Sequence, residues 1–419
     1  MARKVVITGL GATTPIGGDV PTLWKNALKG VSGTHTLTDE WVEKYALPVH
    51  FAAKASTPAT DVLSRVEAKR MDPSTQFAVV AAREAWKDSG IEEVDHDRLA
   101  VAFATGIGGV WTLLDAWDTL REKGPRRVLP MTVPMLMPNG PAAAVSLDLG
   151  ARAGAHTPVS ACASGTEALH IALELIRSGK ADVVMAGGAE AAIHPMPMAS
   201  FAAMQALSKR NDSPETASRP YDISRDGFVM GEGAGALVLE AEEHALARGA
   251  RIYGELAGTA VTADAYHITA PDPQGLGATR ALKGALYDAR ALPEDVVHVN
   301  AHATSTPVGD KPEYTALKAA LGDHLENVCV SATKSQMGHL LGASGAVESV
   351  LTALAVYHRL APVTINLENQ DPEIPLDVVT GTPRELPEGE IMALNNSFGF
   401  GGHNAVVAIR STGPKVEMA

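Results

Sequence analysis

The chain has 419 residues, a formal net charge of −13 at pH 7 and a hydrophobic fraction of 46 %. This length allows two or three domains or one large α/β unit, and the acidity argues against nucleic-acid binding, which needs a basic face. No apolar run reaches the ~18 residues of a membrane-spanning helix, and the start has no signal-peptide core, so we expect a cytoplasmic protein with no membrane partner. The two cysteines, Cys162 and Cys329, fit a reducing compartment, and Cys329 lies in an apolar run typical of the core.

The first predicted strand, residues 4–9, leads into a glycine-rich segment that only partly matches a dinucleotide-binding turn. That turn needs a third glycine where Thr14 stands, and an acidic residue after the next strand, so we expect no nucleotide here. A helix over 75–89 and a strand over 99–104 follow. The proline- and methionine-rich stretch 128–140 is typical of an irregular buried or interface segment.

Cys162 lies where a short β-branched run ends and a helical pattern begins. Small residues surround it over 160–165, and apolar residues recur at helical spacing from 169 to 176, before Gly179. A free cysteine is most often a small buried hydrophobe. At the first turn of a helix, however, unpaired N–H groups favour a thiolate and can bind a developing oxyanion. Both interpretations stay open on this stretch alone.

Two pairs of strand-and-glycine segments recur in the same order. Residues 159–162 resemble 330–334, and residues 231–239 resemble 399–407, at offsets of 171 and 168 positions (330 − 159 and 399 − 231). This repetition predicts a duplicated α/β unit. We expect the first half, which carries insertions, at residues 1–250, the second half at 251–412 and a tail at 413–419.

Four segments built from small residues carry the chemically active side chains, and each borders a predicted strand, as expected where strand ends converge on a site. They are 160–165, 299–310, 333–343 and 395–404. A further motif spans 219–235. On these motifs, from residue 4 to about residue 410, the chain resembles the β-ketoacyl-acyl-carrier-protein synthases, most closely the elongating type II forms of actinobacteria.

The resemblance implies the thiolase fold, in which two similar βαβαβαββ halves form a five-layered α/β/α/β/α sandwich. It implies an acyltransferase that condenses an acyl-cysteine with malonyl-acyl-carrier protein by decarboxylative Claisen chemistry, giving 3-oxoacyl-carrier protein in fatty-acid elongation. It also implies an acyl-carrier-protein partner, a homodimer and no cofactor beyond the carrier's phosphopantetheine. Metal-ligand spacings such as CxxC or HExxH do not occur, and we expect no metal.

The resemblance also assigns roles to individual residues. Cys162 would take the acyl chain as a thioester, because thioesters exchange with thiols without a large energy gap. His302 and His339 would donate N–H groups to the malonyl thioester oxygen, where enolate charge develops, or one of them would instead activate the water that receives the carboxyl group. Lys334 would orient these histidines and Glu348 by hydrogen bonds.

Phe400 would complete an oxyanion hole with the Cys162 N–H, while its ring gates the cysteine. Further residues implied are Thr304 and Thr306 at the pantetheine arm, Ile107, Thr132 and Phe201 in the acyl pocket, Asp310 and Glu313 as supports, and Lys69, Arg70, Arg126 and Arg127 facing the acidic carrier protein.

Several other functions share part of this pattern. The ketosynthase subunit of an aromatic polyketide synthase has the same motifs and is the main alternative. A chain-length factor lacks the cysteine, and a thiolase uses a second cysteine where His302 and His339 stand here. A papain-like hydrolase is disfavoured because two histidines and a lysine are not a hydrolytic triad. A non-enzymatic module that binds carrier protein would form no product.

Overall fold

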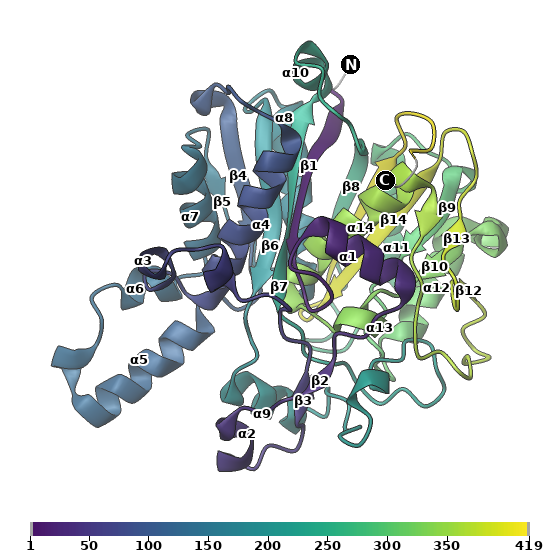
Figure 1. The fold of residues 1–419 in the computed structure, drawn as a ribbon. Helices are drawn as coiled ribbons and strands as arrows, with labels where there is room; N and C mark the ends of the chain where they lie inside the picture. The colour runs from purple at the N-terminus through teal and green to yellow at the C-terminus, as the bar shows by residue number, and fades with distance from the viewer. Residues whose placement is uncertain (1–2, 417–419) are drawn as a thin grey trace.

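One sheet of eleven strands runs through the computed structural model, which describes residues 3–416 (Figure 1). In sheet order the strands are β12 (Asp377–Val378), β10 (Cys329–Ser331), β9 (Val296–Asn300), β14 (Met392–Gly399), β15 (His403–Arg410), β8 (Gly254–Ala263), β1 (Val5–Thr13), β7 (Gly233–Ala241), β6 (Val183–Glu190), β4 (Leu99–Ala104) and β5 (Ala155–His156). Only two residue pairs, Val6 with Glu255 and Ile7 with Gly254, join β1 to β8. The sheet therefore divides naturally at this short antiparallel contact.

The two sides of that contact have the same topology. Outward from it the strands run β1-β7-β6-β4-β5 on one side and β8-β15-β14-β9-β10 on the other. The corresponding connecting helices are α4 (Pro73–Ser89) and α11 (Leu276–Asp288), α7 (Gly140–Leu149) and α12 (Asp310–Leu321), and α8 (Ser164–Arg177) and α14 (Ser344–His358). Each half is thus a βαβαβαββ unit, and the predicted duplication is confirmed.

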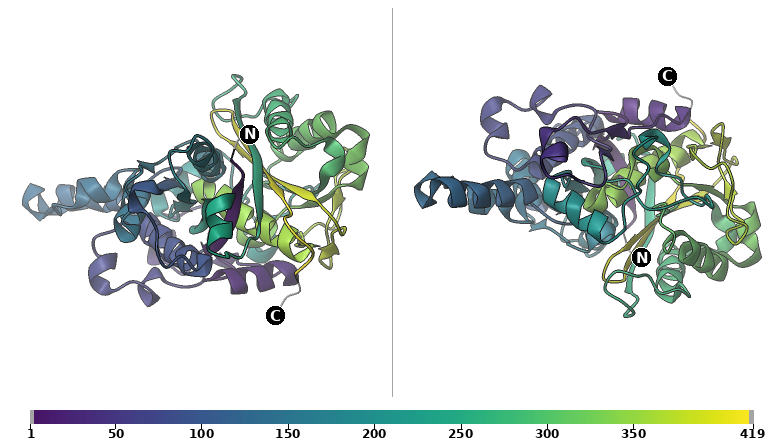
Figure 2. Two further views of the ribbon diagram at one scale, coloured as in Figure 1. Left: turned by 90° about the horizontal axis from the view of Figure 1, so that it is seen from above. Right: turned by 90° about the horizontal axis from the view of Figure 1, so that it is seen from below.

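The helices and the two parts of the sheet are stacked in layers. α8 and α14 pack against each other and against strands of both halves, whereas α4 and α7 cover one outer face and α11 and α12 the other (Figures 1 and 2). Residues 344–356 of α14 are all buried, as expected for a helix in a central layer. β4 is an unbroken apolar run, typical of a parallel strand that is covered on both faces. The predicted five-layered arrangement follows from these contacts.

The first turns of the two central helices, α8 and α14, are in close contact. A Cβ on Gly165 would lie 2.7 Å from the Ala346 nitrogen, and a Cβ on Gly345 would lie 2.8 Å from the Thr166 nitrogen, so neither position accepts a side chain. This close approach places the turn before α8 next to the turn before α14.

The predicted correspondence between residues 159–162 and 330–334 is wrong. The turn that holds Cys162, η4 (Ala161–Ala163), corresponds by its place in the topology to η8 (Leu341–Ala343), and not to residues 330–334. Both turns have a left-handed first residue, with φ of 50° at Ala161 and 48° at Leu341, and both lead into Ala-Ser-Gly. The β7 and β15 segments, in contrast, are equivalent strands as predicted.

Insertions between β1 and β5 and after β6 enlarge the first half. They hold α1 (Val20–Lys29), β2 (His35–Thr36), α2 (Glu40–Lys44), β3 (Phe51–Ala52), α3 (Arg65–Ala68), α5 (Val110–Lys123), α6 (Thr132–Leu136) and α9 (Pro195–Ala203). The second half adds α13 (Lys334–Met337), β11 (Leu360–Ala361) and β13 (Arg384–Glu385). The predicted boundary near residue 250 falls between α10 (Glu242–Ala247) and β8, and residues 1–2 and 417–419, the latter in the predicted tail, lie outside the described residues.

Helix α5 projects from the body (Figures 1 and 2), and we call the segment from α5 to α6 the arm. Its apolar side chains are exposed: Trp117 by 55 %, Leu129 by 62 % and Val133 by 61 %. The prediction for residues 128–140 is a buried or an interface segment; much of this stretch is exposed in the single chain, and exposed apolar side chains are typical of an interface. Within residues 3–416 no helix has the length and apolar character that crossing a membrane requires.

Candidate active site

A cavity of about 530 Å³ lies beside the carboxyl ends of β9 and β14. Segments from both halves line it, and among its lining residues are the following predicted ones: Cys162, His302, His339, Phe400, Thr304, Thr306, Ile107, Phe201 and Glu313. The fold therefore brings into one cavity residues up to 293 positions apart in the sequence, Ile107 and Phe400 (400 − 107).

Cys162 lies in η4, immediately before α8, and is buried. The end of β14 runs against this turn: a Cβ on Gly399 would lie 3.0 Å from the Cys162 nitrogen and 2.8 Å from the Ser160 carbonyl oxygen. Only glycine fits there, and the next residue, Phe400, directs its backbone N–H at the Cys162 sulfur. An N–H in that position can also bind an oxyanion on a carbonyl attacked by the sulfur.

Burial raises the pKa of Cys162 to about 11, although the Lys334 charge and the Phe400 N–H lower it. Burial therefore works against the thiolate that the N–H groups at the helix start are expected to favour. The physical reason is desolvation, which disfavours the charged form and outweighs the nearby positive groups. The sulfur must lose its proton as it attacks a substrate.

We therefore predict that acyl transfer to Cys162 accelerates about tenfold per pH unit between about pH 6 and pH 9, because the thiolate fraction grows tenfold per unit below the pKa. The rate of adduct formation would be followed by rapid quenching and intact-protein mass spectrometry. Cys162→Ala gives the background. A rate that does not change over this range would contradict the prediction and show that the thiolate is already present at about pH 6.

His302 and His339 both line the cavity, and their rings meet edge to face. Their ring centroids lie 5.5 Å apart with the planes at 87°. His339 Nδ1 pairs with Ser344 Oγ at 2.8 Å, whereas His339 Nε2 and His302 Nδ1 are buried without a hydrogen-bond partner among the described residues. Burial, and next to it the Lys334 charge, holds the pKa of both imidazoles well below its usual value. Two neutral rings with unpaired nitrogens can therefore serve an anionic oxygen as N–H donors.

Lys334 and Glu348 form a fully buried ion pair, with Nζ and Oε1 2.5 Å apart. Among residues 3–416 the Lys334 ammonium has this single hydrogen-bond partner, and Lys334 does not line the cavity. The predicted hydrogen bonds from Lys334 to the histidines are therefore absent. Its charge nevertheless lowers the pKa of both rings and of Cys162, so its influence on the cavity is electrostatic.

Glu313, in the first turn of α12, supports the loop that carries His302. Its carboxylate accepts hydrogen bonds from the backbone nitrogens of His302 and Ala303, both at 2.8 Å, and from Asn396 Nδ2 at 3.0 Å. Ala303 has a left-handed φ of 32°, a conformation that a residue other than glycine keeps only where the surroundings impose it. The loop then presents Thr304 and Thr306, whose hydroxyl oxygens lie 3.0 Å apart, to the cavity.

Some predicted residues lie elsewhere. Thr132, on α6, is half-buried and does not line the cavity of this chain. Lys69 and Arg70 are exposed just after α3, and Arg126 and Arg127 are exposed in η3 (Pro125–Arg127), which joins α5 to α6. All four cations lie outside the cavity lining.

Two further residues at the site were missed by the sequence interpretation. The Phe228 ring meets His339 edge-on, with centroids 5.4 Å apart. Glu190, at the end of β6, is fully buried and accepts hydrogen bonds from the backbone nitrogens of Gly106 at 2.9 Å and Gly342 at 3.0 Å. A signal for Glu190 was present, because it is a lone acid at the end of an otherwise apolar strand.

The chain matches two family models, the N-terminal domain of β-ketoacyl synthases over residues 2–245 and the C-terminal domain over 253–368. It is 48 % identical over 410 residues to 3-oxoacyl-[acyl-carrier-protein] synthase 2 of Synechocystis, covering 97 % of this chain and 98 % of that protein. The identity to the Staphylococcus aureus protein of the same name is also 48 %, over 412 residues, with the same shares covered.

Solved structures agree. A type II polyketide ketosynthase in complex with its acyl-carrier protein superposes with a TM-score of 0.91 at 34 % identity, covering 99 % of this chain and 100 % of that one. A β-ketoacyl synthase from Burkholderia phymatum gives 0.89 at 35 % identity, with the same coverage. These matches extend over both halves and over every segment of the cavity. The chain therefore belongs to the β-ketoacyl synthase family and is a condensing enzyme of the thiolase fold.

Proposed function

We propose that the enzyme joins an acyl group on Cys162 to malonyl-acyl-carrier protein, releasing carbon dioxide and giving 3-oxoacyl-carrier protein in fatty-acid elongation. The observation that carries this proposal is the shared cavity, in which one thiol and two neutral imidazoles with unpaired nitrogens face the same volume. The 48 % identity to proteins named 3-oxoacyl-[acyl-carrier-protein] synthase 2 supports the elongating reaction.

In the first half-reaction the Cys162 sulfur attacks the carbonyl carbon of an acyl thioester as the thiol proton leaves. The backbone N–H groups of Cys162 and Phe400 stabilise the oxyanion of the tetrahedral intermediate. The carbon–sulfur bond to the carrier then breaks, and the released carrier thiol takes up a proton. The acyl chain remains on Cys162, and Phe201, whose ring lies 5.3 Å from that of Phe228, lines the apolar wall that would contact it.

In the second half-reaction the malonyl thioester oxygen accepts hydrogen bonds from His302 and His339. Cleavage of the bond to the carboxylate releases carbon dioxide and leaves its electron pair as an enolate, whose negative oxygen the two donors stabilise. The enolate carbon attacks the acyl-cysteine carbonyl, the new carbon–carbon bond forms, and the Cys162 thiolate leaves and regains a proton. Neutral imidazoles suit this step, and the reaction needs neither a metal nor a further cofactor.

Three features complete the proposal. The acidic carrier protein would dock on exposed basic residues such as Lys69 and Arg70, which can steer it by charge. A second copy of the chain would cover the exposed apolar side chains of the α5–α6 arm, giving the homodimer. Two free, buried cysteines suit the reducing cytoplasm.

The test is a reaction of the enzyme with acyl-carrier protein and radiolabelled malonyl-carrier protein. We expect 3-oxoacyl-carrier protein and carbon dioxide in equal amounts, and a module that only binds carrier protein would give neither. As a second arm, exchanging Lys69 and Arg70 for glutamate should raise KM for both thioesters and leave kcat unchanged. The same exchange at Lys180, exposed beyond the far end of α8 from Cys162, is the control.

A polyketide ketosynthase is the second candidate, because the type II polyketide ketosynthase superposes with a TM-score of 0.91 at 34 % identity, and the ishigamide ketosynthase/chain length factor superposes with 0.90 at 32 % identity. The ishigamide ketosynthase is solved together with a chain-length factor. If the chain alone is fully active and carries out one condensation on each saturated acyl group supplied, the result supports fatty-acid elongation. Dependence on a second, cysteine-free subunit would support the polyketide role instead.

A further inference from the structure

The loop from Ala301 to Gly309 carries His302, Thr304 and Thr306, and a segment of the first half holds it from behind. The Gly227 nitrogen donates to the Ser305 carbonyl oxygen at 3.1 Å. Ser305 is fully buried and has a left-handed φ of 68°. Because this conformation is costly for serine, the contacts around Ser305 decide where the loop lies.

Arg225, in the same segment, reaches the loop with its side chain. Its guanidinium is only 7 % exposed, and Nε donates to the Thr306 carbonyl oxygen at 3.3 Å and lies 3.6 Å from Asp310 Oδ2. Its Nη1 donates to Asp371 Oδ2 at 3.0 Å and to the Asp222 carbonyl oxygen at 2.9 Å. Arg225 thus connects the loop and Asp310 with Asp371 of the second half and with Asp222 of the first half.

Asp310 is the partner through which Arg225 acts on Ser305. Its carboxylate is fully buried and accepts from the Ser305 nitrogen at 3.2 Å and from the Tyr221 nitrogen at 2.9 Å. Arg225 is its one ion-pair partner among the described residues. Burial raises the pKa of Asp310 to about 7, and Arg225 is among the groups that oppose this rise. Without the arginine, a buried carboxylate loses its counter-charge, which favours protonation and weakens its hold on Ser305.

The side of the cavity that Arg225 supports serves one half-reaction more than the other. The loop supplies His302, a donor to the enolate, whereas the oxyanion hole for acyl transfer is built from η4 and from the end of β14. The contacts of Arg225 include neither of those segments. A shift of the loop should therefore impair decarboxylation more than acylation of Cys162, because acylation uses Thr304 and Thr306 but not His302.

We infer that Arg225 is a positioning residue for the malonyl step, acting through Asp310 and the Thr306 carbonyl to hold His302, Thr304 and Thr306 against the thioester. This inference rests on the proposed function. Arg225 does not line the cavity, so it contacts no substrate there. Misplacement of a reacting group by about 1 Å can cost on the order of 100-fold in rate, so a support behind the loop can have a large effect.

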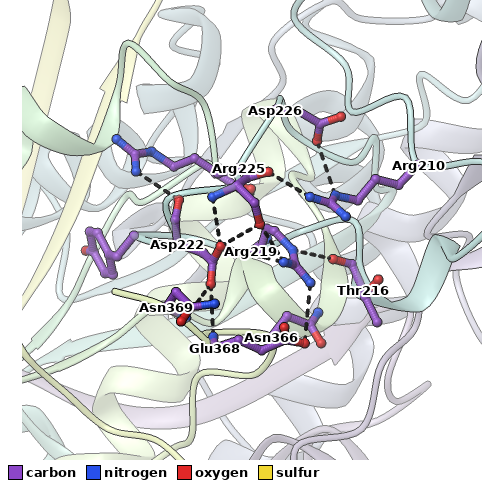
Figure 3. A network of polar contacts seen from close by, with 12 residues as sticks. Arg210, Thr216, Arg219, Asp222, Arg225, Asp226, Asn366, Glu368 and Asn369 are labelled. Atoms are coloured by element: carbon purple, nitrogen blue, oxygen red, sulfur yellow. Dashed lines mark hydrogen bonds and ion pairs between the residues drawn. The ribbon is translucent and has the colours of Figure 1, made fainter. Parts of the chain in front are cut away.

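The test compares Arg225→Met with Arg219→Met. Figure 3 shows both arginines in one polar network with Asp222, and their side chains are equally exposed, 7 % each. The Arg219 side chain contacts Thr216, Asp222, Ser224 and Glu368 and not the loop, and its backbone N–H is kept in the variant. The two variants therefore remove a buried guanidinium of the same kind, with and without contact to the loop.

Acyl-Cys162 formation would be timed by mass spectrometry, and carbon dioxide release from malonyl-carrier protein would be measured separately, with thermal unfolding recorded for each variant. For Arg225→Met we expect the rate of decarboxylation to fall at least about tenfold more than the rate of acylation. Arg219→Met should leave the ratio of the two rates as in the parent. Arg225→Lys should recover part of the loss, because it keeps the charge at Asp310 but not the planar fork.

Equal losses in both half-reactions, or no loss in either, would overturn the inference, as would the same ratio in both arginine variants. Failure of the proposed function is distinguishable, because the parent enzyme would then release no carbon dioxide. If Arg225→Met does not fold, Arg225→Lys carries the test, and it must show the same direction of change in the ratio.

Discussion

Replacing Cys162 by alanine should abolish the acyl-enzyme and lower condensation by about 10⁴-fold or more, the scale on which loss of a catalytic nucleophile is felt. The expectation follows from the cavity, which has one cysteine in its lining. Decarboxylation of malonyl-carrier protein should persist in the variant, because both histidines and their unpaired nitrogens remain in place. Intact-protein mass spectrometry after incubation with acyl-carrier protein reads out the first effect, and carbon dioxide release the second.

Cys329→Ala is the matched control. Cys329 is also buried, in β10, where its thiol donates to the Val297 carbonyl oxygen at 3.4 Å, and it is absent from the cavity lining. This variant should form the acyl adduct at the rate of the parent. An adduct that persists in Cys162→Ala would show that another residue takes the acyl chain, and the proposed mechanism would then fail.

Removing either His302 or His339 should lower decarboxylation and condensation by about 100- to 1,000-fold, the usual cost of losing one preorganised donor to a developing oxyanion. Acylation of Cys162 should proceed, because the N–H groups of Cys162 and Phe400 serve that step. Single-turnover rates for the two half-reactions, measured on His302→Ala and His339→Ala, give the result. If the two rings act independently on the same oxygen, the fold-loss in decarboxylation rate of the double variant should equal the product of the two single fold-losses.

His298→Ala separates catalysis from folding. His298 is fully buried in β9, four residues before His302, and its Nε2 pairs with Ser331 Oγ at 2.9 Å. Its loss should lower thermal stability without changing the ratio of the half-reactions. A fall in acylation as large as the fall in decarboxylation, in either cavity-histidine variant, would contradict the assigned division of labour.

The sequence supported the fold and the identity of the groups in the cavity, because those depend on local patterns. The apolar run of β4 and the strand-to-helix turn at Cys162 were legible from neighbouring residues, and β4 has the predicted bounds, Leu99–Ala104. α4 begins two residues earlier than predicted, because Asp72 caps its first turn and Pro73 is tolerated there.

What the sequence could not supply depends on contacts between distant segments. The raised pKa of Cys162 comes from burial by both halves, which no local pattern reveals. Lys334 meets Glu348 and not the histidines because α13 and α14 fold against each other. Arg225 approaches Asp310 across 85 positions of sequence (310 − 225). The roles assigned to these residues stay predictions, which the separate measurements of acylation and decarboxylation test.

The two equivalent turns before the central helices differ in one position. Gly342 stands where the second half would carry a counterpart of Cys162, and a Cβ there would lie 2.2 Å from the Gly106 nitrogen. A side chain at position 342 would therefore displace the backbone of the first half. The duplicated halves therefore contribute unequally to one cavity: the first supplies the sulfur and the second supplies both imidazoles.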